Sequence, residues 1–153
     1  MSNTVQDFLA ASIQKTALDV TAALLRLPVD RRVWAPAETS RTAMDIFAEC
    51  AMNNGITANV IEARKWVGEP FEVYLQKKVD LAAQGLETIE AQLRENTDRL
   101  IAVIKSVPDD ALEVTIETPY GAGPLRDIMA YPYWNMAYHE GQINYIASML
   151  ALI

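Results

Sequence analysis

Apolar residues recur every three or four positions through four long segments of the chain, and this spacing limits the possible folds more than any other feature. It predicts helices that each bury one apolar stripe. The segments cover residues 5–27, 40–67, 79–107 and 125 to the C-terminus. Prolines and a Gly-Glu-Pro sequence separate them, because proline cannot continue a helix. The pattern therefore predicts an all-α fold, a four-helix bundle with long inter-helix connections.

The second and fourth helices carry signals that refine this prediction. The second helix can be capped by Thr39 or Ser40, or by Thr42, which forms a capping box with Asp45. Its start is therefore defined to within one turn. Pro132 falls inside the apolar pattern of the fourth helix, where we expect a kink or a restart of the helix.

Two stretches between the helices differ from the helical pattern. Residues 71–77 are expected to form a short linker turn. Within residues 111–124, Leu112, Val114 and Ile116 alternate with polar residues. This alternation predicts a short extended segment, closed by a Pro-Tyr-Gly turn. We expect it to be too short and too isolated to form a sheet.

Length and composition place the chain among globular proteins. It has 153 residues, of which 51% are hydrophobic and 22% charged, so one domain over residues 1–153 is expected. Its net charge of −7 argues against nucleic-acid and anionic-membrane partners. The single cysteine, Cys50, excludes an internal disulfide and is typical of a reducing compartment. Without a signal-peptide pattern or a long apolar run, the expected location is the cytoplasm.

The only histidine of the chain lies in the aromatic-rich stretch of residues 131–146. The helical period puts Asn135 and His139 on one buried face, one turn apart. Tyr131 precedes Asn135 by one turn, and Gln142 follows His139 by three residues. Bundle cores are places where such side chains converge on a metal or a ligand.

Glu49 interrupts the apolar stripe of the second helix in a similar way, with Asn53 one turn later. Together with Asn135 and His139, Glu49 would form a mixed nitrogen and oxygen metal site with open positions for water or substrate. A simpler interpretation stands beside this one. A buried Glu49 needs a partner, and His139 can serve as that partner without a metal.

Several short motifs resemble those of the DinB-like superfamily and follow one another in the same order. Residues 138–143, Tyr-His-Glu-Gly-Gln-Ile, resemble its C-terminal signature, in which Arg-Gly-Gln and an aliphatic residue follow a histidine. Residues 42–49 resemble the segment that ends in the first metal-binding histidine. Leu-Pro and Trp-Ala-Pro within residues 27–36 resemble the first inter-helix loop. Residues 118–121, Thr-Pro-Tyr-Gly, resemble the turn before the last helix.

The resemblance implies a four-helix bundle, often dimeric, with a metal held by three histidines. Carried over to this chain, the ligand positions are Glu49, Asn135 and His139, of which only His139 matches the pattern. Glu140 also stands where the family often has arginine. A glutamate in the first position can still bind Zn, Ni, Fe or Mn, whereas an asparagine suits harder cations.

The first functional hypothesis is therefore a metal-dependent enzyme of the DinB-like type. It would be a transferase, in this family often thiol-dependent, or a hydrolase that acts on a small molecule. It would use one divalent metal, Zn, Ni, Fe or Mn, bound by Glu49, Asn135 and His139. The residues expected to line the pocket around the metal are Asn53, Tyr131, Tyr138 and Gln142.

The second hypothesis is a metal-free descendant that binds a small ligand or serves as a dimeric interaction module without catalysis. Here Glu49 hydrogen-bonds His139 and Asn135 across the core, and the polar network fixes the packing. Aromatic residues on the outer face of the last helix would form the seam of a homodimer, because aromatic side chains are enriched at interfaces.

Overall fold

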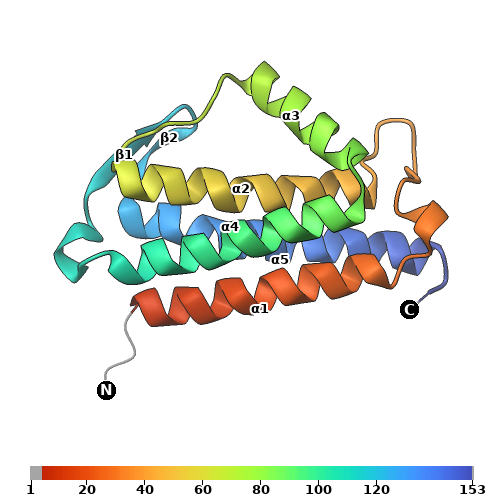
Figure 1. Ribbon diagram of the computed structural model, residues 1–153, viewed down its shortest axis with the longest axis horizontal. Helices are drawn as coiled ribbons and strands as arrows, with labels where there is room; N and C mark the ends of the chain where they lie inside the picture. The colour runs from red at the N-terminus through yellow and green to blue at the C-terminus, as the bar shows by residue number, and fades with distance from the viewer. Residues whose placement is uncertain (1–4, 153) are drawn as a thin grey trace.

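The computed structural model describes residues 5–152 and consists mainly of helices. Four long helices lie side by side, and a shorter helix, α3, lies against α2 (Figure 1). The all-α four-helix bundle expected from the sequence is confirmed. The helices are α1 (Val5–Leu25), α2 (Ala43–Ala63), α3 (Phe71–Ala83), α4 (Leu86–Ser106) and α5 (Leu125–Met149).

The apolar stripes of the four long helices meet in one core. Helix α1 packs against α5 and α4, and α2 packs against α4 and α5. Ile13, Phe47, Leu100 and Met136, one from each long helix, are completely buried. Burial of each such side chain contributes about 1.5–3 kcal/mol. The core therefore fixes how α2 faces α5, which is the pairing on which the candidate site depends.

Helix α1 is, within residues 5–152, the one helix that is long and apolar enough to cross a membrane. Of its most apolar stretch, 44% is buried inside the bundle. Leu9, Ile13, Val20 and Leu24 form the buried stripe. A core helix of a soluble protein has the same length and composition, so this feature is weak evidence for a membrane span.

Helix α2 is shorter than the predicted segment at both ends. Thr42, rather than Thr39 or Ser40, is its N-cap, and the Thr42 Oγ1 accepts a hydrogen bond from the Asp45 backbone N at 3.1 Å. Arg64, with φ 54°, ends the helix in the left-handed conformation. This N-cap fixes the start of α2, and with it the direction in which the first-turn side chains point.

The predicted linker turn at residues 71–77 is wrong, because these residues form most of α3. The predicted third helix over residues 79–107 is in fact the end of α3 followed by α4. Gly85 separates the two helices with φ 91°, a conformation that other residues rarely adopt. Lys78 and Leu81 are the buried residues assigned to α3. The apolar residues Phe71, Leu75 and Val79 follow one another at a spacing of four but are exposed, so α3 is not a core helix.

The segment before α5 forms a small sheet, contrary to expectation. Strands β1 (Thr115–Thr118) and β2 (Gly121–Pro124) pair antiparallel, with Thr118 opposite Gly121. Gly121 has φ 127°, which favours glycine at this tight turn. The hairpin is supported by α5, since the backbone N of Leu125 donates to the Val114 carbonyl at 2.8 Å. These contacts explain why so short a sheet can form.

Helix α5 runs from Leu125 to Met149 without interruption. Pro132 lies inside it and is buried, so the predicted restart of the helix at this residue is wrong. The loss of one backbone hydrogen bond at Pro132 is tolerated because the helix is held on both sides by α1 and α2. Asn135 and His139 therefore stay on one continuous face.

Candidate functional site

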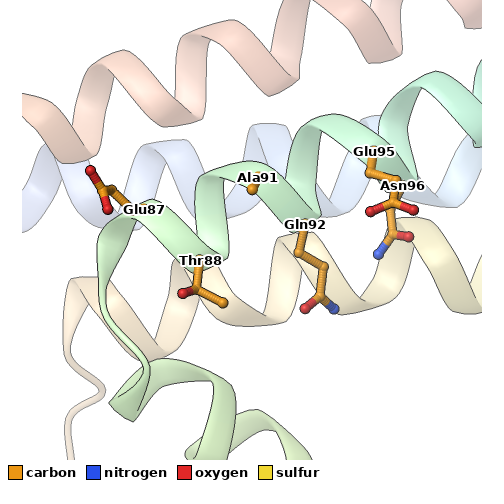
Figure 2. A pocket seen from close by; sticks show the side chains of 6 residues that line it. All are labelled: Glu87, Thr88, Ala91, Gln92, Glu95 and Asn96. Carbon is orange, nitrogen blue, oxygen red and sulfur yellow. The ribbon is translucent and has the colours of Figure 1, made fainter.

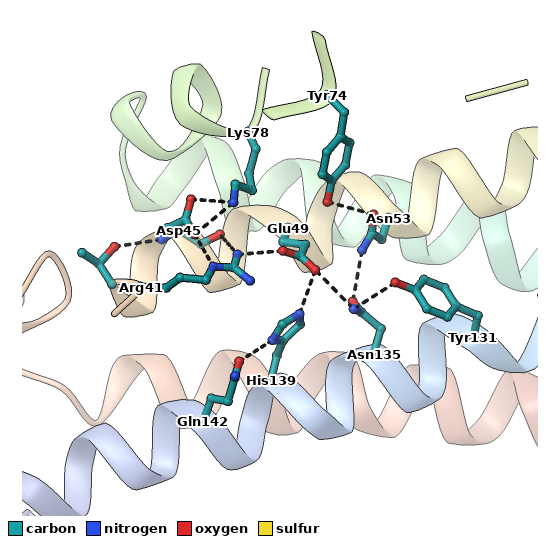
Figure 3. Close-up of polar contacts among 11 residues, drawn as sticks. Arg41, Asp45, Glu49, Asn53, Tyr74, Lys78, Tyr131, Asn135, His139 and Gln142 are labelled. Carbon is teal, nitrogen blue, oxygen red and sulfur yellow. Dashed lines mark hydrogen bonds and ion pairs between the residues drawn. The ribbon is translucent and has the colours of Figure 1, made fainter. Parts of the chain in front are cut away.

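The structure brings Glu49, Asn135 and His139 together where α2 faces α5 (Figure 3). The Glu49 Oε1 lies 2.9 Å from the His139 Nε2 and 3.5 Å from the Asn135 Nδ2. The His139 side chain is 4% exposed and the Glu49 side chain 16% exposed. The polar residues that interrupt the apolar stripes of α2 and α5 thus form one cluster, as their spacing in the sequence suggested.

Both ring nitrogens of His139 have a partner. The Nδ1 lies 2.7 Å from the Gln142 Oε1, one turn along the same helix. Because a carboxylate can only accept, the Nε2 carries the proton that bonds Glu49. With Nε2 protonated, Nδ1 of the neutral ring is an acceptor and takes a hydrogen bond from the Gln142 amide nitrogen, whereas Nδ1 of the doubly protonated ring donates to the amide oxygen. The imidazole is therefore held in one orientation from both edges.

Asn135 belongs to a second set of hydrogen bonds that reaches α3. Its Nδ2 donates to the Tyr131 hydroxyl at 3.4 Å, and its Oδ1 accepts from the Asn53 Nδ2 at 3.4 Å. The Tyr74 hydroxyl donates to the Asn53 Oδ1 at 3.2 Å. Burial and the charge of Glu49 raise the pKa of both Tyr74 and Tyr131. Both phenols thus stay neutral hydrogen-bonding groups at neutral pH.

A chain of ion pairs adjoins Glu49 on its other side (Figure 3). The guanidinium of Arg41 contacts the Glu49 Oε2 at 2.7 Å and also pairs with Asp45. The Lys78 Nζ, from α3, lies 3.1 Å from the Asp45 Oδ1. The Lys78 side chain is only 11% exposed. Two cations and two carboxylates therefore alternate in a line that ends at His139.

Sequence reasoning missed the two cations. Arg41, Asp45 and Glu49 are spaced by four residues, so the helical period could have placed them on one face. Lys78 offered no such signal, because it comes from α3, which the apolar pattern did not reveal.

The Glu49 carboxylate is held in its charged form. Burial of the group opposes this charge, but the hydrogen bond from His139 and the positive charge of Arg41 outweigh it. Together they lower the pKa of Glu49 from 4.5 to about 2. Glu49 is therefore a permanent acceptor at neutral pH, whereas burial of Cys50 on the same helix strongly raises the pKa of its thiol. The Cys50 side chain is also completely buried, which argues against a role as a nucleophile.

An aromatic stack lies on α5 beside the site. The Trp134 ring is 5.8 Å from the Tyr131 ring and 5.5 Å from the Tyr138 ring, between centroids. The Tyr138 ring also meets His139 edge-on at 5.4 Å. Tyr138 is 53% exposed, so it lies at the rim rather than inside the polar cluster. The homodimer seam predicted for the outer aromatic residues stays a prediction.

Two open surface hollows lie along α4, away from this cluster. Figure 2 shows one of them, which α4 lines alone. The other lies between α1 and α4. Neither hollow contains Glu49 or His139, and neither includes a histidine or cysteine that could act as a nucleophile or base. The Glu49–His139 cluster is therefore the stronger candidate.

The donor atoms do not fit the metal that the family resemblance implies. Among residues 5–152, no group of three or more His, Cys, Asp or Glu side chains is arranged to hold a metal ion. Of the three expected ligands, Glu49 and His139 offer strong donor atoms and Asn135 does not, and the second oxygen of Glu49 faces the guanidinium of Arg41. A neutral carboxamide such as Asn135 adds little affinity for a transition metal.

The fold, in contrast, has clear counterparts. No family model and no curated protein matches the chain. Solved structures do match it, among them two proteins from Bacillus subtilis. YfiT, described as "a probable metal-dependent hydrolase with an unusual four-helix bundle topology", superposes with a TM-score of 0.84 at 11% identity, covering 99% of this chain and 90% of its own. The DinB-like protein YjoA superposes with a TM-score of 0.68 at 13% identity, covering 94% and 92%. The fold that the sequence resemblance implies is confirmed: the chain shares the four-helix-bundle fold of these two proteins.

Proposed function

We propose that this chain acts on a small molecule as a hydrolase or transferase, with Glu49 and His139 as an acid–base pair. The observation that carries the proposal is the 2.9 Å contact between an ionised Glu49 and a nearly buried imidazole. A carboxylate that holds one edge of an imidazole makes the other edge a better base. The likeness to YfiT supports a hydrolase at the level of the fold.

In this proposal each partner of His139 has a role. Glu49 holds the Nε2 proton and stabilises the imidazolium that forms when the ring accepts a second proton. Nδ1 is then the basic atom, and it becomes available when a substrate takes the place of the half-buried Gln142 amide. The partly exposed Arg41 and Tyr138 border the cluster where a substrate would approach.

A second candidate is a metal-dependent hydrolase or transferase with Zn, Ni, Fe or Mn. The description of YfiT favours it, and Glu49, Asn135 and His139 would be the ligands. The donor atoms described above argue against it. A non-catalytic ligand-binding module would use the same cluster and differ only in its lack of turnover.

Turnover assays on protein purified without an affinity tag separate these candidates. The substrates are activated esters and amides, and small electrophiles offered with a low-molecular-weight thiol. We expect activity that survives EDTA and is lost in Glu49→Gln and His139→Gln. Glu62→Gln is the matched control, because Glu62 forms an exposed ion pair with Arg99.

Equal rates in the wild type and His139→Gln with every substrate would contradict the proposed acid–base function. Loss of activity in EDTA, with recovery on adding one of the four metals, would favour the second candidate instead. Binding of a compound at Glu49 and His139 without turnover would identify a ligand-binding module.

A further inference from the structure

We propose that Arg41 supplies, as a fixed cation, the positive charge that a metal ion would bring to this site, and that it thereby excludes divalent metals from Glu49 and His139. The inference concerns the site of the proposed function, but it rests on contacts and charges and not on a reaction. Arg41 acts as a positioning residue: it orients Glu49, which in turn holds His139.

The guanidinium of Arg41 is anchored at several points. Arg41 immediately precedes Thr42, the N-cap of α2, so its backbone adjoins the capped start of this helix. Its side chain pairs with the Asp45 carboxylate, contacts the Asp45 carbonyl at 3.2 Å and contacts the Glu49 Oε2 at 2.7 Å. Guanidinium groups match carboxylates with several directed hydrogen bonds, which a flexible ammonium group does not provide. The cation therefore has one defined position.

The charges of the site already balance without a metal. Lys78 and Arg41 carry two positive charges, and Asp45 and Glu49 carry two negative charges. The side chains of Lys78 and Glu49 are 11% and 16% exposed, so solvent screens their charges only in part. A divalent ion at Glu49 would add two positive charges next to the Arg41 guanidinium. Both carboxylates of the described chain of ion pairs already face a cation, so neither could neutralise these added charges.

The orientation of Asn135 also disfavours a metal ion at Glu49 and His139. The oxygen of its carboxamide, the atom that could bind a metal, accepts from Asn53. The amide nitrogen faces both Glu49 and Tyr131 and cannot coordinate. Tyr74 holds Asn53 in place from α3. Turning the Asn135 oxygen toward Glu49 would therefore break hydrogen bonds that extend over three helices.

Cobalt(II) binding tests the inference directly, because Co²⁺ coordinated by protein ligands gives visible absorption bands. Asn135→His supplies the missing second imidazole, and Arg41→Gln removes the cation. We expect no saturable Co²⁺ absorption in the wild type. We expect the double variant Arg41→Gln/Asn135→His to bind Co²⁺ at least roughly tenfold more tightly than Asn135→His alone.

Arg99→Gln/Asn135→His is the matched control, since Arg99 pairs with Glu62 on the surface. It should bind Co²⁺ no better than Asn135→His. Arg41→Lys/Asn135→His, which keeps the charge, should resemble Asn135→His more than the double variant. Equal Co²⁺ affinity with and without Arg41 would overturn the inference.

A test that does not depend on the folding of these variants uses the wild type alone. Its melting temperature should not change with Zn²⁺, Ni²⁺ or Mn²⁺, and it should take up no stoichiometric metal. One ion bound per chain of the wild type would overturn the inference. These metal-binding experiments measure no turnover, so a metal found at the site would not by itself refute the acid–base proposal. Conversely, a protein without catalytic activity would not refute the exclusion of metals by Arg41.

Discussion

Acidification should remove a measurable part of the folding stability through Glu49. Its pKa is about 2 in the folded chain, compared with an ordinary value of 4.5. Each pKa unit corresponds to about 1.4 kcal/mol, so the ionised Glu49 contributes on the order of 3 kcal/mol. Because the folded pKa is the lower one, this contribution is fully present above pH 4.5 and is lost as the pH falls toward 2. The Glu49 side chain is 16% exposed, so only modest screening reduces the value.

Urea unfolding of the wild type and Glu49→Gln between pH 7 and pH 2.5 measures this contribution. The free energy of unfolding of the wild type should fall with pH more steeply than that of Glu49→Gln, by about 2–3 kcal/mol over the range. The comparison uses the pH dependence because Glu49→Gln also leaves Arg41 and His139 without their partner. Glu62→Gln should keep the wild-type slope. Parallel pH curves for the wild type and Glu49→Gln would refute the explanation of the low pKa.

Three further perturbations test separate parts of the structure. His139→Ala should destabilise the chain by about 1–3 kcal/mol, because it leaves Glu49 without its buried donor. EDTA should leave the melting temperature of the wild type unchanged, and a large effect of EDTA on it would contradict the metal-free site. Tyr74→Phe should cost about 1 kcal/mol and speed amide hydrogen exchange in α3 more than in α4, since it removes the bond to Asn53; uniform exchange would show that this bond does not hold α3. Gly85→Ala should destabilise by about 1 kcal/mol or more in thermal unfolding, because φ is 91° there, and Gly141→Ala, in a helix with open space around the glycine, is the control that should not.

Much of the fold could be predicted because the four long helices bury regular stripes. Residues such as Ile13, Phe47 and Leu100 repeat at helical spacing and indeed form the core. Helix α3 escaped prediction because it does not follow the pattern of a core helix: Lys78 and Leu81 are its buried residues, and apolar residues such as Phe71 and Val79 are exposed. The β-hairpin escaped because its stability depends on backbone contacts with α5, which lie outside any local pattern.

The candidate site could be predicted only as far as helical faces allow. Glu49 and His139 each interrupt an apolar stripe, so a contact between them is expected as soon as α2 and α5 are placed face to face. The direction of the Asn135 amide depends on Asn53 and on α3, so the helical spacing of the residues does not predict it. The pairing of Lys78 with Asp45 likewise arises from tertiary packing. The homodimer, the cytoplasmic location and the single domain stay predictions.

Nitrogen-15 NMR of the imidazole tests the central claim most directly, since His139 is the only histidine and its signals need no assignment. The account predicts an Nε2 that carries a proton hydrogen-bonded to Glu49, with shifts that change in Glu49→Gln and not on addition of Zn²⁺. An Nε2 without a proton and with the shift of a metal ligand, in the protein as purified or after addition of Zn²⁺, would contradict it.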